Sequence, residues 1–237
     1  MVDFAHIASH DLQEPLRKIQ AFGSRLESKY ATVLDDRGVD YVQRMQNAAS
    51  RMQILVQELL SYSLVTTQAK PFEPTDLQVI LDEVLIDLEI RIELDNAQLD
   101  ISPLSTIDAD AIQMRQLFQN IIGNALKFTV PGRQPCITVE GYSFVDDQEN
   151  EIYELIIADN GIGFDEKYIK KIFGIFQQVH KQNGYEGTGV GLAICKKIIE
   201  RHSGTINVKS EPNVGTTFII QLPMVQEKTE HTTGETV

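Results

Sequence analysis

The sequence predicts an α+β protein: an N-terminal helical hairpin that forms a dimeric four-helix bundle, followed by an α/β sandwich domain with a mixed sheet. Three observations lead to this prediction. Residues 1–69 consist largely of helix formers, with apolar side chains at alternating spacings of three and four, which is typical of bundled helices. Near residue 70 the segment KPFEPTD interrupts this pattern with two prolines. Beyond it, helical stretches alternate with short strand-like runs.

Two long helices, joined by the turn LDDRG at residues 34–38, account for the first segment. Each helix carries one apolar seam. The seam of the first comprises Leu12, Leu16, Ile19, Gly23, Leu26 and Tyr30. The seam of the second comprises Tyr41, Met45, Ala48, Met52, Leu55, Leu59 and Tyr62. A lone hairpin cannot cover both seams, so we expect two chains to pair into a four-helix bundle.

The second segment is expected to form one domain over residues 70–225. Helical stretches at about 76–92, 110–129 and 188–203 alternate with the strand-like runs CITVEGYSF, YELIIAD, TINVKS and TTFIIQL. The last two runs are joined by EPNVG, a short connection that predicts an antiparallel hairpin and therefore a mixed sheet. The polar residues 226–237 are expected to form a disordered tail.

Composition excludes several kinds of partner. The net charge of −13 disfavours nucleic acid and anionic lipid surfaces. No apolar run approaches the roughly 18–20 residues that a bilayer requires, so we expect no membrane contact by this segment. The two cysteines, Cys136 and Cys195, lie far apart in apolar surroundings, which predicts buried thiols in a reducing, cytoplasmic compartment.

His10 lies in the stretch ASHDLQEPLRKI. On a helix that advances about 100° per residue, it falls opposite the seam that contains Leu12 and therefore faces solvent. The adjacent Asp11 can fix the imidazole tautomer that leaves the other nitrogen available as a nucleophile. Pro15 lacks the N–H that would bond the Asp11 carbonyl, so we expect the helix to bend here.

Three stretches of the second domain predict binding of phosphate and adenine. QNIIGNALKF places Asn120, Asn124 and Lys127 on one helical face, where amide oxygens and an ammonium suit Mg²⁺ and phosphate. IIADNGIGFD puts Asp159 at a strand end, where a carboxylate can accept a hydrogen bond from an exocyclic amine. EGTGVGLAICKKIIERH places three glycines before a strong helix, whose N-terminal amides attract phosphate.

These glycines do not form the other common nucleotide motifs. Leu192 stands where G-x-G-x-x-G needs its third glycine, and there is neither a G-x-x-x-x-G-K-[ST] loop nor an H-R-D and D-F-G pair. Dinucleotide-binding domains, P-loop NTPases and Ser/Thr/Tyr-type kinases are therefore disfavoured. About 25 residues with few regular features separate the second and third stretches, and we interpret them as a lid over the nucleotide.

Taken in order, the motifs resemble those of sensor histidine kinases, whose ATP-binding domain is shared with Hsp90, type II topoisomerases and MutL. FAHIASHDLQEPL resembles the H box, QNIIGNALKF the N box, DNGIGFD the first glycine box, IFGIF the F box and GTGVGL the second glycine box. HDLQEPL is especially similar to phytochrome-type kinases. Five motifs in this order make the match specific.

The resemblance implies a homodimeric kinase that uses ATP and Mg²⁺ to phosphorylate its own His10, and that passes the phosphoryl group to an aspartate of a response regulator receiver domain. Asp11 would act as general base or orienting partner, with Asn120 and Lys127 beside the reaction. Asn124 would hold Mg²⁺. The residues implied to bind the nucleotide are Asn124, Lys127, Phe128, Asp159, Gly161, Gly163, Lys181, Gly187, Thr188, Gly189, Gly191 and Leu192.

The chain departs from the family pattern at two positions. Many members carry an arginine shortly after the F box that reaches the γ-phosphate, but here the matching residue is Gln178, and Lys181 is the candidate substitute. Many members also carry Thr or Asn three residues after the acidic neighbour of the histidine, where it orients a water that dephosphorylates the regulator. Glu14 occupies that position, which predicts weak phosphatase activity.

Two alternatives stay open. One is another ATPase of the same nucleotide fold whose hairpin only dimerises the chain, but it gives no reason for His10, Asp11 and Pro15 on the exposed face. The other is a degenerate kinase that acts as a dimeric scaffold, although every motif glycine and both asparagines are present. The chain holds no sensor module, so we expect it to be the transmitter part of a larger receptor. Membrane attachment of that receptor, and phosphorylation within or between subunits, are left open.

Overall fold

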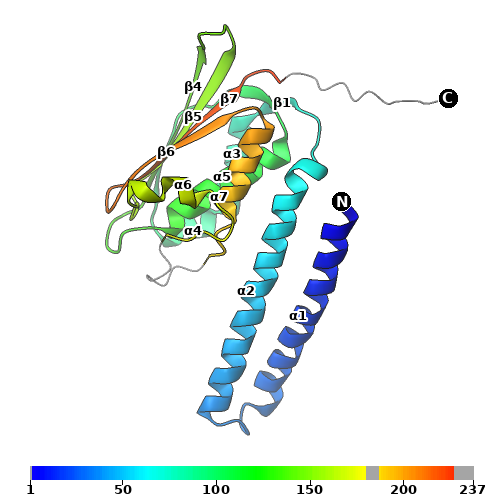
Figure 1. Cartoon of the computed structure of the whole chain (residues 1–237). Coiled ribbons are helices and arrows are strands. Elements are labelled where there is room, and N and C mark those ends of the chain that lie inside the picture. Colours follow the sequence, from blue (N-terminus) through cyan, green and yellow to red (C-terminus); the bar gives the residue numbers. More distant parts are fainter. Residues whose placement is uncertain (1, 180–186, 227–237) are drawn as a thin grey trace, which may run out of the picture. The chain divides into compact units, whose positions relative to one another are not determined.

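The computed structural model describes residues 2–179 and 187–226, with side chains from residue 11 onwards (Figure 1). The expected tail therefore lies outside the described residues except for Gln226, as does Lys181. The chain divides into two compact units, which are described separately below. The first contains the N-terminal hairpin together with Ile172–Ile194, and the second contains Ala69–Lys171 and the segment that follows from Cys195.

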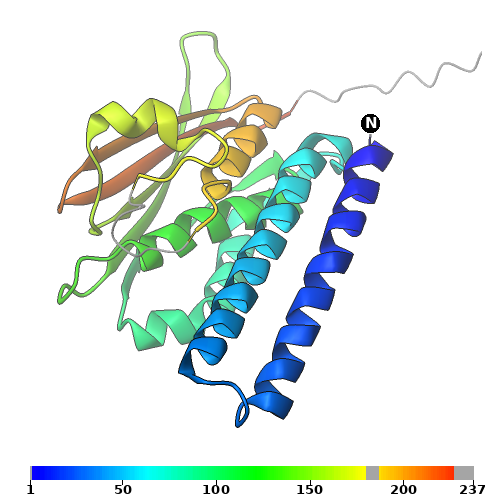
Figure 2. The same ribbon diagram turned by 60° about the horizontal axis from the view of Figure 1, so that its bottom comes forward.

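The N-terminal hairpin consists of α1 (Val2–Tyr30) and α2 (Asp36–Thr67), as predicted (Figure 2). The α2 helix begins where Asp35 caps it, because the Asp35 side chain accepts a hydrogen bond from the Gly38 N–H at 2.8 Å. Pro15 lies inside α1, which is a single helix on both sides of it. The expected bend at this proline stays a prediction.

Only a small part of the two seams is buried inside one hairpin. In α1 the buried members are Leu16 and Gly23, and in α2 the buried residues are Val42, Ala49 and Val65, none of which belongs to the predicted seam. Most of the large seam residues are at least 37% exposed: Leu12, Ile19, Leu26, Tyr30, Tyr41, Met45, Met52 and Leu59. The intrachain contact of α2 thus uses a neighbouring helical face, and the predicted seam is available to a second hairpin.

The second unit is built on a five-stranded mixed sheet with the strand order β2-β4-β5-β7-β6. The strands are β2 (Gln98–Ile101), β4 (Cys136–Val145), β5 (Glu151–Asp159), β6 (Thr205–Glu211) and β7 (Gly215–Pro223). β2 pairs with β4 in parallel and the other neighbours are antiparallel, including the predicted β6–β7 hairpin. The predicted mixed sheet is therefore confirmed.

A smaller sheet pairs β1 (Glu73–Asp76) with β3 (Thr106–Ala109). Neither strand, nor β2, was predicted from the sequence. Each has four residues, which is too short for an alternating pattern to stand out. Their pairing partners lie elsewhere in the chain, so only the folded structure defines them.

Helices cover one face of the larger sheet (Figure 1). They are α3 (Leu77–Asp87), α4 (Glu89–Leu94), α5 (Ala111–Lys127), the 3₁₀ turn η1 (Glu166–Tyr168), α6 (Ile169–Ile172) and α7 (Gly191–Arg201). The helix predicted at 76–92 is divided at Leu88, and the last predicted helix begins at Gly191, not at residue 188. Buried side chains of α5, such as Leu117 and Phe118, share the core with Leu155 of β5 and Ile220 of β7.

The two cysteines are free thiols, as expected. Cys195 in α7 is buried, whereas Cys136 at the start of β4 is partly exposed, so the prediction of two buried thiols is only half right. Burial alternates along the first residues of β4, and Cys136 stands on the less buried of its two faces.

A buried polar cluster fixes the start of the second unit. The Asp110 carboxylate accepts hydrogen bonds from the Lys70 N–H at 2.9 Å and from Arg201 at 3.2 Å. The Arg201 guanidinium also donates to the Lys70 carbonyl and lies over the Phe72 ring, 4.4 Å from its centroid. The Asp110 N–H donates to Nε2 of His202, and burial lowers the pKa of that imidazole. The segment after α2 is thus tied to the ends of α5 and α7.

We expect Asp110→Ala to lower the free energy of unfolding of the second unit by about 3 kcal/mol or more. The change leaves the mostly buried Arg201 without its carboxylate and also removes the N-cap of α5, where Asp110 accepts from Ile112 at 3.1 Å. Urea denaturation followed by circular dichroism measures the loss. Asp100→Ala, at an exposed position of β2, is the control, with an expected effect below about 0.5 kcal/mol. Equal stabilities of the two variants would contradict this account.

Candidate functional site

The predicted phosphoacceptor, His10, lies in the first half of α1. Its side chain is outside the described residues, so its outward orientation stays a prediction. The neighbouring Asp11 is exposed. Residues that follow His10 by three, four and seven positions share its helical face, and these are Gln13, Glu14 and Arg17.

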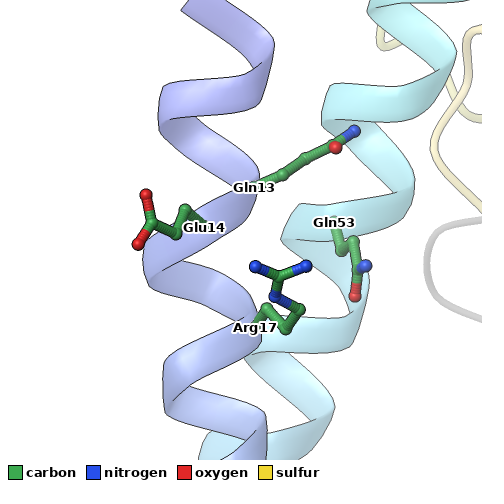
Figure 3. A pocket seen from close by; sticks show the side chains of 4 residues that line it. All are labelled: Gln13, Glu14, Arg17 and Gln53. Atoms are coloured by element: carbon green, nitrogen blue, oxygen red, sulfur yellow. The ribbon is translucent and has the colours of Figure 1, made fainter.

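A small polar cavity lies along this face of the hairpin (Figure 3). Its volume is about 100 Å³, and Gln13, Glu14 and Arg17 of α1 line it together with Gln53 of α2. Figure 3 shows that Gln13 points toward α2, that the Arg17 side chain lies between the two helices, and that Glu14 points away from α2. Glu14 pairs with Lys18 at 2.6 Å. The surface beside the predicted acceptor therefore offers amides and charges of both signs.

Asp159, the predicted adenine-reading residue, ends β5. Its Oδ1 atom accepts hydrogen bonds from the Gly161 N–H at 2.8 Å and from the Thr216 N–H at 3.2 Å. Within the described part of the chain Oδ2 takes no protein donor, which leaves it for an external one. Burial raises the pKa of Asp159 to about 6, while the two N–H donors oppose the rise. At neutral pH the site therefore holds a fixed, largely ionised acceptor.

The glycines of the DNGIG loop lie close to neighbouring backbone. A Cβ atom on Gly161 would lie 2.3 Å from the Phe128 carbonyl oxygen, and one on Gly163 would lie 2.0 Å from the Glu211 carbonyl oxygen. Gly163 also has φ of +53°, a conformation that side chains disfavour. Both glycines therefore let the loop pack against neighbouring backbone, which holds Asp159 in place; their implied contact with the nucleotide stays a prediction.

On α5, Asn120 and Asn124 are partly buried and Phe128 follows the last helical residue, Lys127. The Nδ2 atom of Asn120 is buried and has no hydrogen-bond partner among the described residues. Its side chain still comes close enough to the Cys195 thiol to counter part of the burial that raises the pKa of that thiol to about 12. A thiol is a weak acceptor, and a buried donor that is poorly satisfied is costly, so this atom suits a phosphate oxygen, and the amide oxygens of the same helix suit Mg²⁺.

The second glycine box and the F-box segment are in contact with each other. Gly189 has φ of +76°, and a Cβ atom there would lie 2.5 Å from the Gln177 carbonyl oxygen. The Gln178 side chain donates a hydrogen bond to the Gly187 carbonyl. Gln178, which stands at the expected arginine position, thus fastens one segment to the other. Lys181 falls outside the described residues.

The remaining predicted residues lie beside this contact. Thr188 is partly buried, Gly191 begins α7, and Leu192 follows it in the first turn of that helix. Phe176, which precedes the contact, has φ of +64° and is 49% exposed. The start of α7 thus presents backbone N–H groups next to a glycine-rich segment, and their contact with phosphate stays a prediction.

The sequence did not predict the residues that support the loop after β5, which follows Asp159. The Asn160 side chain accepts from the Cys136 N–H and donates to the Gln134 carbonyl, both at 2.9 Å. Arg133 donates to the carbonyl oxygens of Asn160 and Asn213. The segment VPGR, which has the form of a turn, marked the position of Arg133 in the chain, but nothing local revealed its partners.

Comparison with known protein families gives two matches that together cover most of the chain. Residues 1–68 match the family model described as His Kinase A (phospho-acceptor) domain. Residues 109–226 match the one described as histidine kinase-, DNA gyrase B- and HSP90-like ATPase. Within the described residues, no helix combines the length and apolar character needed to span a membrane.

Curated relatives and solved structures agree with these matches. The phytochrome-like protein Cph1 of Synechocystis is 40% identical over 221 residues, which cover 93% of this chain and 29% of that protein. This chain thus spans less than a third of that relative. A crystal structure of full-length ShkA with AMPPNP matches 96% of this chain and 47% of its own, with a TM-score of 0.68 and 24% identity. The complex of the histidine kinase ThkA with the response regulator TrrA matches 94% of this chain and 61% of that chain, with a TM-score of 0.61 and 25% identity.

Proposed function

We propose a two-step phosphotransfer reaction for this chain, which belongs to the histidine kinase family. A nitrogen of the His10 imidazole attacks the γ-phosphorus of ATP, a nitrogen–phosphorus bond forms, and ADP leaves. The phosphoryl group then passes to an aspartate of a response regulator receiver domain. The proposed binding of ATP rests on the Asp159 carboxylate. Its Oδ1 accepts hydrogen bonds from two backbone N–H groups, while Oδ2 takes no protein donor among the described residues.

Residues 1–69 would be the dimerisation and phosphoacceptor domain and residues 70–225 the ATP-binding domain. The exposed apolar seam of the hairpin supports the homodimer, because a second hairpin would remove these side chains from water. The ThkA–TrrA complex is the comparison that supports a receiver domain as partner. A cytoplasmic location is proposed from the free thiols and the absence of a membrane-spanning helix among the described residues.

In the ATP-binding domain, Asp159 would accept a hydrogen bond from the adenine 6-amino group. Asn124 would hold Mg²⁺, which neutralises phosphate charge when it is bound. Lys127 and the unpartnered amide nitrogen of Asn120 would contact phosphate oxygens. Because phosphoryl transfer is catalysed mainly by positioning and charge stabilisation, these residues would orient the γ-phosphate and disperse its charge.

On the hairpin, Asp11 would orient the His10 ring and accept its proton as the new bond forms. The positive charge that many family members supply with an arginine is absent at Gln178, whose side chain is bound to the Gly187 carbonyl. Lys181 is our candidate for that charge. A lysine presents a single ammonium group, whereas the planar guanidinium of arginine can bind two phosphate oxygens at once. We therefore expect Lys181 to bind the γ-phosphate more weakly than an arginine would.

The reaction is tested by incubating the full chain with γ-labelled ATP and Mg²⁺ and then adding a receiver domain. The kinase forms a label that is acid-labile and base-stable and that moves to the receiver. An ATPase with a merely dimerising hairpin would release labelled phosphate without labelling the chain, and a scaffold would do neither. Either of these two results would contradict the proposal.

We also expect this chain to dephosphorylate its phospho-regulator only weakly. Glu14 stands where the family resemblance leads us to expect Thr or Asn, and its carboxylate adds negative charge beside an incoming phospho-aspartate. Loss of label from a purified phospho-regulator is the measurement. Glu14→Thr should accelerate the loss about tenfold, equivalent to about 1.4 kcal/mol. Glu27→Thr, an exposed change on the same helix, is the control, and rapid loss that Glu14→Ala abolishes would contradict the expectation.

A further inference from the structure

Arg133 occupies a surface turn directly after the helix that carries the N box. Its N–H donates to the Val130 carbonyl at 3.0 Å, which closes the turn VPGR. Pro131 stands at the second position of this turn and Gly132, with φ of +79°, at the third, as a type II turn requires. The turn therefore fixes the point of the backbone from which the Arg133 side chain extends.

From this point the Arg133 guanidinium joins two segments that are distant in sequence. One of its nitrogens, Nη1, donates to the carbonyl oxygens of Asn160 and Asn213, both at 2.9 Å. Asn160 directly follows Asp159. Asn213 lies in the β6–β7 turn and its own N–H donates to the Ile162 carbonyl at 2.7 Å.

The same two segments hold the Asp159 carboxylate. One of its donors, the Gly161 N–H, comes from the loop after β5, and the other, the Thr216 N–H, comes from the start of β7. A shift of the β6–β7 turn against the loop would therefore change the direction in which Oδ2 points. Arg133 is charged and makes both of its carbonyl contacts at ordinary hydrogen-bond distance, so it opposes that shift.

We propose that Arg133 is a positioning residue for adenine recognition: it clamps the two segments and thereby sets the orientation of the Asp159 carboxylate. The inference rests on the proposed role of Asp159. The loop does not need Arg133 to fold, since the Asn160 side chain independently binds the Cys136 N–H and the Gln134 carbonyl. Loss of the Arg133 side chain would thus change the orientation of the Asp159 carboxylate more than it would change the fold.

The test compares two nucleotides on the full chain: ATP and purine riboside triphosphate, which lacks the 6-amino group. Calorimetry or fluorescence gives both dissociation constants. Arg133→Gln should weaken ATP about five- to tenfold and the analogue less than about twofold. Asp159→Asn should abolish the preference for ATP, and adding Arg133→Gln to that variant should then change the ratio of the two constants no further.

Arg115→Gln is the matched control. Arg115 of α5 also binds two partners, but these are the carboxylates of Glu83 and Asp87 on α3 and not carbonyls that flank Asp159. It should leave the preference for ATP unchanged. Equal weakening of both nucleotides by Arg133→Gln, with a lowered melting temperature, would mean a merely structural role and overturn the inference. No weakening of either nucleotide would also overturn it. If Asp159→Asn kept the preference for ATP, the proposed role of Asp159 would be wrong and the inference would fall with it.

Discussion

We expect His10→Gln to abolish incorporation of label from γ-labelled ATP into this chain, while nucleotide affinity should stay within about twofold of the parent. A glutamine amide has no nucleophilic nitrogen lone pair, so the step that forms the nitrogen–phosphorus bond has no acceptor. The adenine contacts proposed here lie on the separate Asp159 loop and should be unaffected. Acid lability and base stability of the label identify the phosphoramidate in the parent chain.

The matched control is His6→Gln, which changes the other histidine of the same helix. His6 lacks an acidic neighbour on its C-terminal side, where Ile7 follows it, so labelling should remain at the parent level. Label that survives in His10→Gln, or label that resists acid, would refute the assignment. A chain that stays monomeric at micromolar concentration would contradict the bundle on which the assignment depends.

Mixing two inactive variants resolves which subunit receives the phosphoryl group. Subunits with His10→Gln keep the ATP-binding residues, and subunits with Asn124→Ala keep the acceptor. In mixed dimers, label on the Asn124→Ala chain means transfer between subunits, whereas no label means transfer within one subunit. The result depends on the handedness of the connection between α1 and α2, near residues 31–38.

Asp159→Asn is expected to have opposite effects on stability and on binding. The Asn carbonyl can accept the two backbone N–H groups that Oδ1 accepts now, which directs the amide NH₂ toward the adenine 6-amino group. Two donors then face each other, so ATP affinity should fall by 100-fold or more, about 3 kcal/mol. The nucleotide-free chain should become more stable, because the substitution removes a buried charge whose pKa has been raised to about 6.

The pH dependence gives this prediction a second readout. The pKa of Asp159 rises from 3.8 to about 6 on folding, so between these values the folded state binds more protons than the unfolded state. Its contribution to stability without nucleotide therefore declines as pH rises through this window. ATP affinity changes in the other direction and falls as pH drops through about 6, since the protonated carboxyl group is a poorer acceptor.

Thermal melts and nucleotide titrations from pH 5 to 8 measure both effects, and Asp159→Asn should flatten both profiles. Asp165→Asn is the control, because Asp165 is exposed and a hydrogen bond from Lys167 lowers its pKa. A melting temperature of Asp159→Asn several degrees above that of the parent is expected. A lower melting temperature, or unchanged ATP affinity, would contradict the reading of Asp159 as a buried adenine acceptor.

Much of this molecule follows from local pattern. The long helices and the β6–β7 hairpin are where the sequence predicts them, because apolar spacing and turn residues act over a few positions. The helix expected at 76–92 is divided at Leu88. The sequence does not predict this break, because no proline or glycine marks it. The short strands β1, β2 and β3 were missed because four residues carry too little pattern.

The sequence by itself determined the order of the motifs, and with it the family and the candidate acceptor and nucleotide residues, since these depend on residue type at fixed spacing. Only the tertiary structure decided how those residues are held. The Arg133 side chain meets carbonyls 27 and 80 positions away in the chain, and Asp159 takes one donor from Thr216. Such contacts depend on which strands become neighbours in the sheet, and strand order is a long-range property that no local spacing encodes.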